Sequence, residues 1–137
     1  MKRYFNMYLD ANFFVFAVLD NTKKGQKARS IQEEIMNGKW AITSVLALDE
    51  VMWVFIKNKK EHLLRKVIED IYAMPNLEVR EVSSSIPMRA LEIMEQFGLK
   101  PRDAFHLSIM ESFQIDTIVS DDVDFDKVKK IRRIKIE

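Results

Sequence analysis

The sequence contains no cysteine among its 137 residues, and this absence excludes several kinds of chemistry. A chain without thiols forms no disulfide bonds, has no catalytic thiolate and offers no thiolate ligand to a metal. The absence also suits a reducing compartment, in which disulfides are rare. We therefore expect a cytoplasmic protein.

Long hydrophobic runs and a strong net charge are missing as well. The longest uncharged apolar run near the N-terminus, residues 13–19, is far shorter than the ~20 residues of a membrane span. Asn6, Asp10 and Asn12 interrupt the region that a signal peptide would need, and no cleavage pattern follows. Because 22 Lys and Arg residues nearly balance 21 Asp and Glu residues, any binding to nucleic acid must come from local patches.

Glycine and proline are scarce, with three of each, and they lie where helices and strands are expected to end. Hydrophobic residues make up 47% of the chain and charged residues 31%, which is a globular balance. A chain of this length buries a core without disulfide or metal support. We predict a single domain over residues 1–137.

Hydrophobic spacing and capping residues predict alternating strands and helices. The expected strands are residues 4–9, 40–43, 77–82, 117–120 and 131–136. The expected helices are residues 10–19, capped by Asp10 or Asn12, then 25–37, 44–57, 61–74, 84–98 and 100–113. In the second helix Ala28, Ile31, Ile35 and Met36 should share one helical face. This order predicts an α/β fold of three α/β/α layers around a mostly parallel sheet of about five strands.

Acidic residues collect at the expected carboxyl ends of the strands. Residues 120–126 read SDDVDFD and follow the fourth strand, and Asp10 follows the first. Glu50 and Asp103 lie near the starts of helices that begin at the same edge, where open parallel sheets bind ligands. Asp10, Glu50, Asp103 and Asp122 would then share one cavity and repel one another unless a cation neutralised them.

The ligand type narrows the choice of metal. An all-oxygen set without cysteine suits Mg²⁺ or Mn²⁺ better than zinc. Such ions support phosphoryl chemistry, because they polarise a phosphate and activate water. The sequence therefore predicts a metal-dependent hydrolase that acts on phosphate esters.

Four segments in this order resemble the motifs of PIN-domain nucleases, especially the VapC-type toxins of prokaryotic toxin–antitoxin pairs. They are YLDAN at 8–12, Thr43-Ser44 with Glu50 following, PRDA at 101–104 and SDDVDF at 120–125. The resemblance runs from residue 8 to residue 125. It departs from the usual pattern at Ser120, where the family typically has threonine, and at Asp121, where it often has asparagine, so either Asp121 or Asp122 could be the ligand.

The resemblance implies a function and a set of site residues. Asp10, Glu50, Asp103 and Asp122 would be the catalytic acids and hold Mg²⁺ or Mn²⁺, with Asn12, Ser44, Ser120 and Asp124 in support. The protein would be an endoribonuclease that hydrolyses RNA phosphodiester bonds, the toxin of a toxin–antitoxin pair. Its partners would be an RNA substrate, a second copy of the chain in a homodimer and an antitoxin protein.

Each of these signals also has a purely structural interpretation. Asp103 could simply favour the start of its helix, and Glu50 could be a surface residue beside Asp49. The aspartates of residues 120–126 could form a solvated turn, although an EF-hand is excluded because Gly and Glu are missing where it needs them. His106, one helical turn beyond Asp103, fits a packing or supporting role.

Basic and apolar patches suggest partners. The basic residues of the C-terminal segment are Lys127, Lys129, Lys130, Arg132, Arg133 and Lys135. They could protect an edge strand from aggregation or steer phosphates, with Lys100 and Arg102 on the other rim. Apolar runs at residues 13–16 and 51–56 indicate self-association.

Three other functions are compatible with parts of the pattern. A PIN-domain nuclease could process RNA outside a toxin pair, or a PIN-like module could bind RNA or protein without cutting. A response-regulator receiver has a similar length and strand order, but it needs an acidic pair after the first strand and an aspartate after the third. Here a single Asp10 and the sequence Val82-Ser83-Ser84 occupy those places, so the receiver ranks last.

Overall fold

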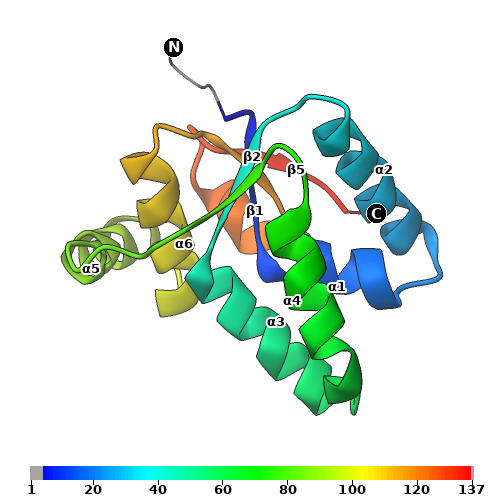
Figure 1. The fold of residues 1–137 in the computed structure, drawn as a ribbon. Helices are drawn as coiled ribbons and strands as arrows, with labels where there is room; N and C mark the ends of the chain where they lie inside the picture. The colour runs from blue at the N-terminus through cyan, green and yellow to red at the C-terminus, as the bar shows by residue number, and fades with distance from the viewer. Residues whose placement is uncertain (1–4, 137) are drawn as a thin grey trace.

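The computed structural model describes residues 5–136, which form a parallel five-stranded sheet with helices on both faces (Figure 1). The strands are β1 (Met7–Leu9), β2 (Ala41–Ser44), β3 (Leu77–Arg80), β4 (Thr117–Val119) and β5 (Arg132–Ile134). The helices are α1 (Ala11–Leu19), α2 (Lys23–Met36), α3 (Val45–Lys57), α4 (Leu64–Ala73), α5 (Ile86–Phe97) and α6 (Pro101–Ser112). Two 3₁₀ helices, η1 (Glu61–Leu63) and η2 (Val123–Lys127), complete the fold.

The strand order is β3-β2-β1-β4-β5, and all neighbours run parallel. The three-layer α/β/α architecture predicted from the sequence is therefore confirmed, with a sheet that is wholly parallel. Strand β1 lies at the centre, and the order reverses between β1 and β4. This reversal is the place where open α/β sheets build their ligand sites.

Two hydrophobic clusters fill the space between the sheet and the helices. Residues of β1 alternate between them, because successive side chains of a strand point to opposite faces. Met7 and Leu9 pack with α1 to α4, whereas Tyr8 packs with α5 and α6. In Figure 1, α5 and α6 accordingly lie on the side of the sheet opposite to α1 and α2. A strand buried on both faces explains why the region around Tyr8 lacks polar alternation.

Helices α1 and α3 begin directly at the strand ends. Asp10 separates β1 from α1, and its carboxylate accepts from the backbone N–H groups of Asn12 and Phe13, so Asp10 rather than Asn12 is the N-cap. Ser44 ends β2 and caps α3 through the N–H of Ala47. Such caps satisfy N–H groups that have no partner inside the helix. They also fix polar side chains at the carboxyl edge of the sheet.

Several boundaries differ from the sequence prediction. Helix α2 begins at Lys23 and is capped by Thr22. A Cβ on Gly25 would lie only 1.9 Å from the carbonyl oxygen of Asp20, so this glycine permits close packing inside the first turn. Of the four residues predicted to share one helical face, Ala28, Ile31 and Ile35 are buried, whereas Met36 at the end of the helix is 49% exposed.

The other differences are shortenings of predicted elements. Strands β3 and β5 are shorter than predicted, and residues 61–74 divide into η1 and α4. The first strand begins at Met7, and the predicted start at Tyr4 lies outside the described residues. Across residues 5–136, every helix falls short of the length or the hydropathy that crossing a bilayer requires.

Candidate active site

The first acidic residue of the site lies where the two central strands end. Strands β1 and β4 pair in register, with Leu9 opposite Val119, so Asp10 and Ser120 are neighbours at the carboxyl edge. The Ser120 hydroxyl donates to Asp10 Oδ2 at 2.5 Å, while Oδ1 accepts from the start of α1 at 3.0 and 3.3 Å. Burial raises the pKa of the Asp10 carboxyl to about 6, although these hydrogen bonds favour its charged form.

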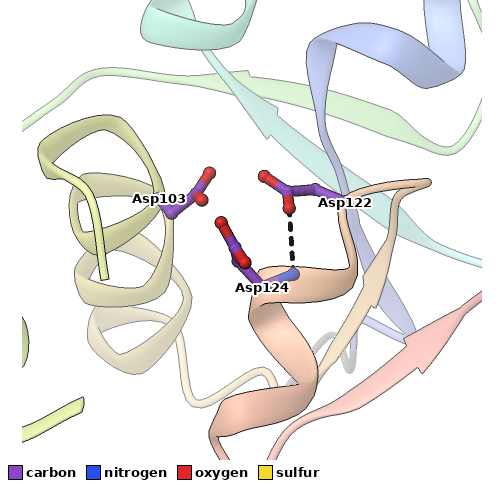
Figure 2. Close-up of side chains that lie close together, drawn as sticks. All are labelled: Asp103, Asp122 and Asp124. Atoms are coloured by element: carbon purple, nitrogen blue, oxygen red, sulfur yellow. Dashed lines mark hydrogen bonds between the residues drawn. The ribbon is translucent and has the colours of Figure 1, made fainter. Parts of the chain in front are cut away.

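Three aspartates form a second acidic group, which we call the aspartate cluster: Asp103, Asp122 and Asp124. Each contributes a carboxylate oxygen, and the three oxygens lie within 4.8 Å of one another. Asp103 extends from the first turn of α6, whereas Asp122 and Asp124 come from the start of η2 (Figure 2). Residues far apart in the sequence thus present three carboxylates to one point.

Local hydrogen bonds explain how the chain turns its aspartates toward α6. Asp122 caps η2, because its Oδ1 accepts from the N–H of Asp124 at 2.9 Å, as the dashed line in Figure 2 marks. The N–H of Asp122 in turn donates to the Ser120 hydroxyl oxygen at 3.0 Å. This hydroxyl therefore joins Asp10 to the aspartate cluster.

The aspartate cluster is electrostatically unsatisfied. Burial, followed by the hydrogen bond and the negative charge of Asp122, raises the pKa of Asp103 to about 7. Within residues 5–136, neither Asp103 nor Asp122 forms an ion pair, and Asp124 has one at 3.7 Å with Lys127. A cation in this place would remove the repulsion.

Glu50 is held by a buried histidine, His106. His106 Nε2 lies 2.5 Å from Glu50 Oε1, and Arg102 Nη1 lies 3.7 Å from Oε2. The other ring nitrogen of His106 lies 2.6 Å from the hydroxyl of Tyr8, which also contacts the Ser44 hydroxyl at 2.8 Å. Burial raises the pKa of the Tyr8 phenol above its ordinary range, so its proton stays on oxygen.

A cavity of about 700 Å³ opens beside Glu50. Its lining combines the carboxylate of Glu50 and the guanidinium of Arg102 with the apolar side chains of Trp53 and Ile56. Trp53 is 64% exposed. The site is therefore open to a large ligand on the α3 side.

The family model described as the PIN domain matches residues 7–131, which is most of the chain. The chain belongs to the PIN-domain family. The resemblance recognised in the sequence motifs is confirmed. No curated protein matches the chain by sequence.

Solved structures with the same fold include several toxin–antitoxin proteins. A chain of VapBC2 from Rickettsia felis, crystallised with a promoter DNA fragment, has a TM-score of 0.73 at 19% identity, covering 96% of this chain and 98% of that one. VapC20 from Mycobacterium tuberculosis, described as a sarcin-ricin loop cleaving toxin, has a TM-score of 0.75 at 14% identity, covering 88% and 93%. A chain of DNA-bound VapBC from Salmonella typhimurium has 0.70 at 15%, covering 98% and 100%. At these identities the likeness shows a shared fold.

The predicted acids of this PIN domain do not all meet at one point. Asp103 and Asp122 lie together with Asp124, which the sequence predicted only as a supporting residue. Asp10 and Glu50 stand outside that set of oxygens and connect to the site through Ser120 and His106.

The alternative between Asp121 and Asp122 has a geometric basis. Asp121 Oδ1 accepts from the Asn12 side-chain amide at 2.8 Å, and its other oxygen lies 4.0 Å from Lys24. Asp122 instead faces Asp103. Asn12 thus holds Asp121 against α1 and away from the aspartate cluster.

Sequence reasoning missed the roles of Tyr8 and Arg133. Tyr8 belongs to the YLDAN motif, but its partner His106 lies 98 positions away, so the sequence does not indicate their contact. Arg133 belongs to the basic C-terminal segment, yet its side chain is only 6% exposed. It donates to the Ser120 carbonyl at 3.0 Å and pairs with Asp126 at 2.9 Å, which braces the loop that carries the aspartates. Only the adjacency of β4 and β5 could have pointed to that contact.

The donor set suits a hard divalent cation. The three carboxylates offer only oxygen ligands. Within residues 5–136, this is the one group of acidic or histidine side chains that lie close enough together to hold an ion. Mg²⁺ and Mn²⁺ prefer such ligands, whereas zinc favours nitrogen and sulfur. The residues therefore fit the kind of metal that the sequence predicted.

Proposed function

We propose that this PIN-domain chain is a Mg²⁺- or Mn²⁺-dependent endoribonuclease that hydrolyses RNA phosphodiester bonds, and that it acts as the toxin of a toxin–antitoxin pair. The observation that carries the proposal is the aspartate cluster at the strand-order reversal of a PIN fold. The three carboxylates repel one another, and this repulsion favours the binding of a cation. The same cation would stabilise the negative charge that develops on the phosphate during hydrolysis.

The acidic residues divide the work by position. Asp103, Asp122 and Asp124 would hold the cation, which supplies Lewis acidity to the phosphate and lowers the pKa of attacking water. Asp10 uses both carboxylate oxygens in hydrogen bonds, so it orients Ser120 and the loop that follows. Glu50, which we propose as a fourth acid of the metal site, keeps Oε2 beside Arg102 and can accept the proton of the attacking water at that atom.

Basic residues around the site would bind the RNA backbone. Lys127 and Arg102 each lie 3.7 Å from an acidic side chain of the site, so their charges stand at its rim. Lys100 precedes α6 and is exposed, as is Lys129, whereas Lys130 pairs with Glu111 at 3.3 Å. Charges of this kind favour phosphate binding without sequence preference.

The proposed partners rest on the relatives and on exposed apolar side chains. VapBC and FitAB structures contain an antitoxin with each toxin, and we propose the same kind of partner here. Helix α3 exposes Met52, Trp53 and Ile56 to 40%, 64% and 48%. This surface supports a homodimer, because a monomer rarely leaves so much apolar area on one helix. The cytoplasm, where RNA is accessible, remains the proposed location.

An RNA cleavage assay tests the proposal directly. Purified wild-type protein is incubated with structured RNA in Mn²⁺, in Mg²⁺ and in chelator, beside an Asp122→Asn variant whose fold is checked by circular dichroism. Cleavage should require the metal and should be lost in the variant. Retained cleavage in chelator or in folded Asp122→Asn would refute the assignment of the aspartate cluster as the metal site.

Calorimetry separates the enzyme from a PIN-like module that binds without cutting. The enzyme requires Mn²⁺ binding that disappears in Asp122→Asn. Absence of metal binding together with tight RNA binding would favour the non-cutting module. A wild-type chain that cuts RNA but does not arrest growth when expressed would favour RNA processing outside a toxin pair.

A further inference from the structure

The buried residues around His106 form a continuous chain of hydrogen bonds that crosses the core to Glu50. Ser44, Tyr8 and His106 are 0%, 0% and 2% exposed. The separations are 2.8 Å from the Ser44 hydroxyl to that of Tyr8, 2.6 Å from Tyr8 to His106 Nδ1, and 2.5 Å from His106 Nε2 to Glu50 Oε1. A polar network this deep in an apolar core is retained only if its members are satisfied.

Donor and acceptor counting assigns the hydrogens. An ionised Glu50 only accepts, so His106 Nε2 carries a hydrogen. The Ser44 oxygen already accepts from the Ala47 N–H at 3.2 Å. Its own hydrogen is therefore used if it donates to Tyr8, Tyr8 donates to Nδ1, and Nε2–H donates to Glu50.

The reverse direction leaves a hydrogen unused. If Nδ1–H donated to Tyr8 and Tyr8 donated to Ser44, the Ser44 hydroxyl hydrogen would have no acceptor. A hydroxyl hydrogen left without an acceptor this deep in the core would destabilise the fold. The forward direction satisfies all four residues, and it fixes the tautomer of His106.

The network connects two residues at the start of helix α3 with a residue of helix α6. Ser44 caps the first turn of α3, and Glu50 lies on the second turn of the same helix. His106 comes from α6, one turn beyond Asp103. The ring thus ties the helix that carries Glu50 to the helix that carries Asp103, and it occupies Oε1, whereas Oε2 lies 3.7 Å from Arg102.

We propose that His106 is a positioning residue, which holds Glu50 by its Oε1 through a tautomer set by Tyr8 and Ser44 and thereby shapes the metal-binding site. The proposal rests on the proposed function, since it assigns His106 a purpose toward the same cation. Removing the partner that orients a metal-site residue typically lowers metal affinity by about 10–100-fold. The same loss is expected when His106 no longer reaches Glu50.

Two substitutions separate the two nitrogens of the ring. Gln is long enough to place an amide N–H near Nε2, so His106→Gln keeps a donor for Glu50 and loses the acceptor for Tyr8. Asn is shorter and occupies the region of Nδ1, so His106→Asn keeps contact with Tyr8 and loses Glu50. Ser108→Ala is the matched control, because Ser108 is buried on the same helix and its hydroxyl has no partner.

Mn²⁺ affinity measured by calorimetry on the full chain decides between these variants, after thermal melts confirm that each is folded. We expect a loss of about 10–100-fold in His106→Asn, nearly full affinity in His106→Gln and no change in Ser108→Ala. Wild-type affinity in His106→Asn would overturn the proposal. Equal losses in Asn and Gln variants would also overturn it, because packing of the ring would then explain the effect.

Nuclear magnetic resonance of the imidazole nitrogens tests the tautomer without any substitution. Long-range ¹H–¹⁵N spectra of the wild-type chain should show Nε2 protonated and Nδ1 unprotonated, and a proton on Nδ1 alone would refute the network. If the wild-type chain bound no Mn²⁺, the proposed function would fail, and with it the purpose given to His106. If it bound Mn²⁺ and His106→Asn bound equally well, only the positioning role would fail.

Discussion

The two acidic regions of the site are built in opposite ways. Asp10 and Glu50 are held by protein donors, namely Ser120 with the start of α1 and His106 with Arg102. The aspartate cluster instead brings Asp103, Asp122 and Asp124 together, and among the described residues 5–136 its one ion pair is the contact of Asp124 with Lys127. The first region is organised by the chain alone, whereas the second stays repulsive until a cation binds.

The largest effect should come from the aspartate cluster. Asp122→Asn removes a charge that faces Asp103, so RNA cleavage should fall by more than the roughly 10–100-fold typical of removing a supporting partner. Initial rates of RNA cleavage in saturating Mn²⁺ measure the effect. Asp126→Asn is the control, because Asp126 pairs with Arg133 at 2.9 Å outside the cluster. Equal loss in both variants would mean that general loop charge, and not the cluster, supports activity.

Metal should stabilise the wild-type fold through the same three residues. A ligand at 100 times its dissociation constant adds about 2.7 kcal/mol to the free energy of unfolding. Thermal melts with and without Mn²⁺ should therefore differ for the wild-type chain and coincide for Asp122→Asn. Asp126→Asn should respond as the wild type does. A metal-induced shift that survives in Asp122→Asn would place the ion elsewhere.

The raised pKa values of Asp103 and Asp10 predict how the free energy of unfolding depends on pH in chelator. In the folded chain the pKa of Asp103 is about 7 and that of Asp10 is about 6, both above their ordinary values. Between about pH 4 and pH 7 the folded state keeps protons that the unfolded state has released, so the free energy of unfolding falls as pH rises. This contribution is fully present below about pH 4 and is lost above the folded pKa values.

Asp103→Asn isolates the effect, because the amide stays neutral at every pH. Urea titrations in chelator should show that the variant gains stability over the wild type at pH 8 and loses this advantage at pH 4. Asp126→Asn is the matched control, because Arg133 lowers the pKa of Asp126. The change in the free energy of unfolding caused by Asp126→Asn should therefore vary with pH in the opposite direction. A constant difference between Asp103→Asn and wild type from pH 4 to pH 8 would contradict the raised pKa.

Sequence patterns predicted the parts of the fold and the site that depend on local or topological rules. Asp10 and Ser44 cap helices that start at strand ends, and Asp103 lies in a first turn behind Pro101. Each follows from short-range capping preferences. The neighbouring strands β1 and β4 then bring Asp10 and the loop after β4 to one edge.

Long-range contacts explain what the sequence did not predict. The pairing of Glu50 with His106 spans 56 positions, and no periodicity marks it. Asp124 joins the cluster because η2 turns residues 123–127 back toward α6, which composition alone does not show. Helical spacing puts Met36 on the same face as Ile31 and Ile35, yet α2 ends there and leaves the side chain exposed. Packing between distant segments decided each case.

The smallest expected effect concerns the basic residues at the rim. Lys127 is the cation nearest the aspartate cluster, at 3.7 Å from Asp124, and its side chain is half exposed. If it contacts RNA phosphate, Lys127→Ala should reduce the salt dependence of RNA binding by about 0.7 per charge, the value for single strands. Binding is measured in chelator, so that cleavage does not interfere.

Lys66→Ala provides the matched loss of one charge on α4, where Lys66 pairs with Asp70 at 2.7 Å. The salt dependence of this variant should equal that of the wild type. Lys130 pairs with Glu111, so Lys130→Ala should fall between the two. If all three variants gave the same slope, the basic run would be explained by its place beside and within β5, an edge strand that charge protects from pairing with another chain. The approach of RNA would then depend on the α3 side of the site, where Arg102 and Trp53 line the cavity beside Glu50.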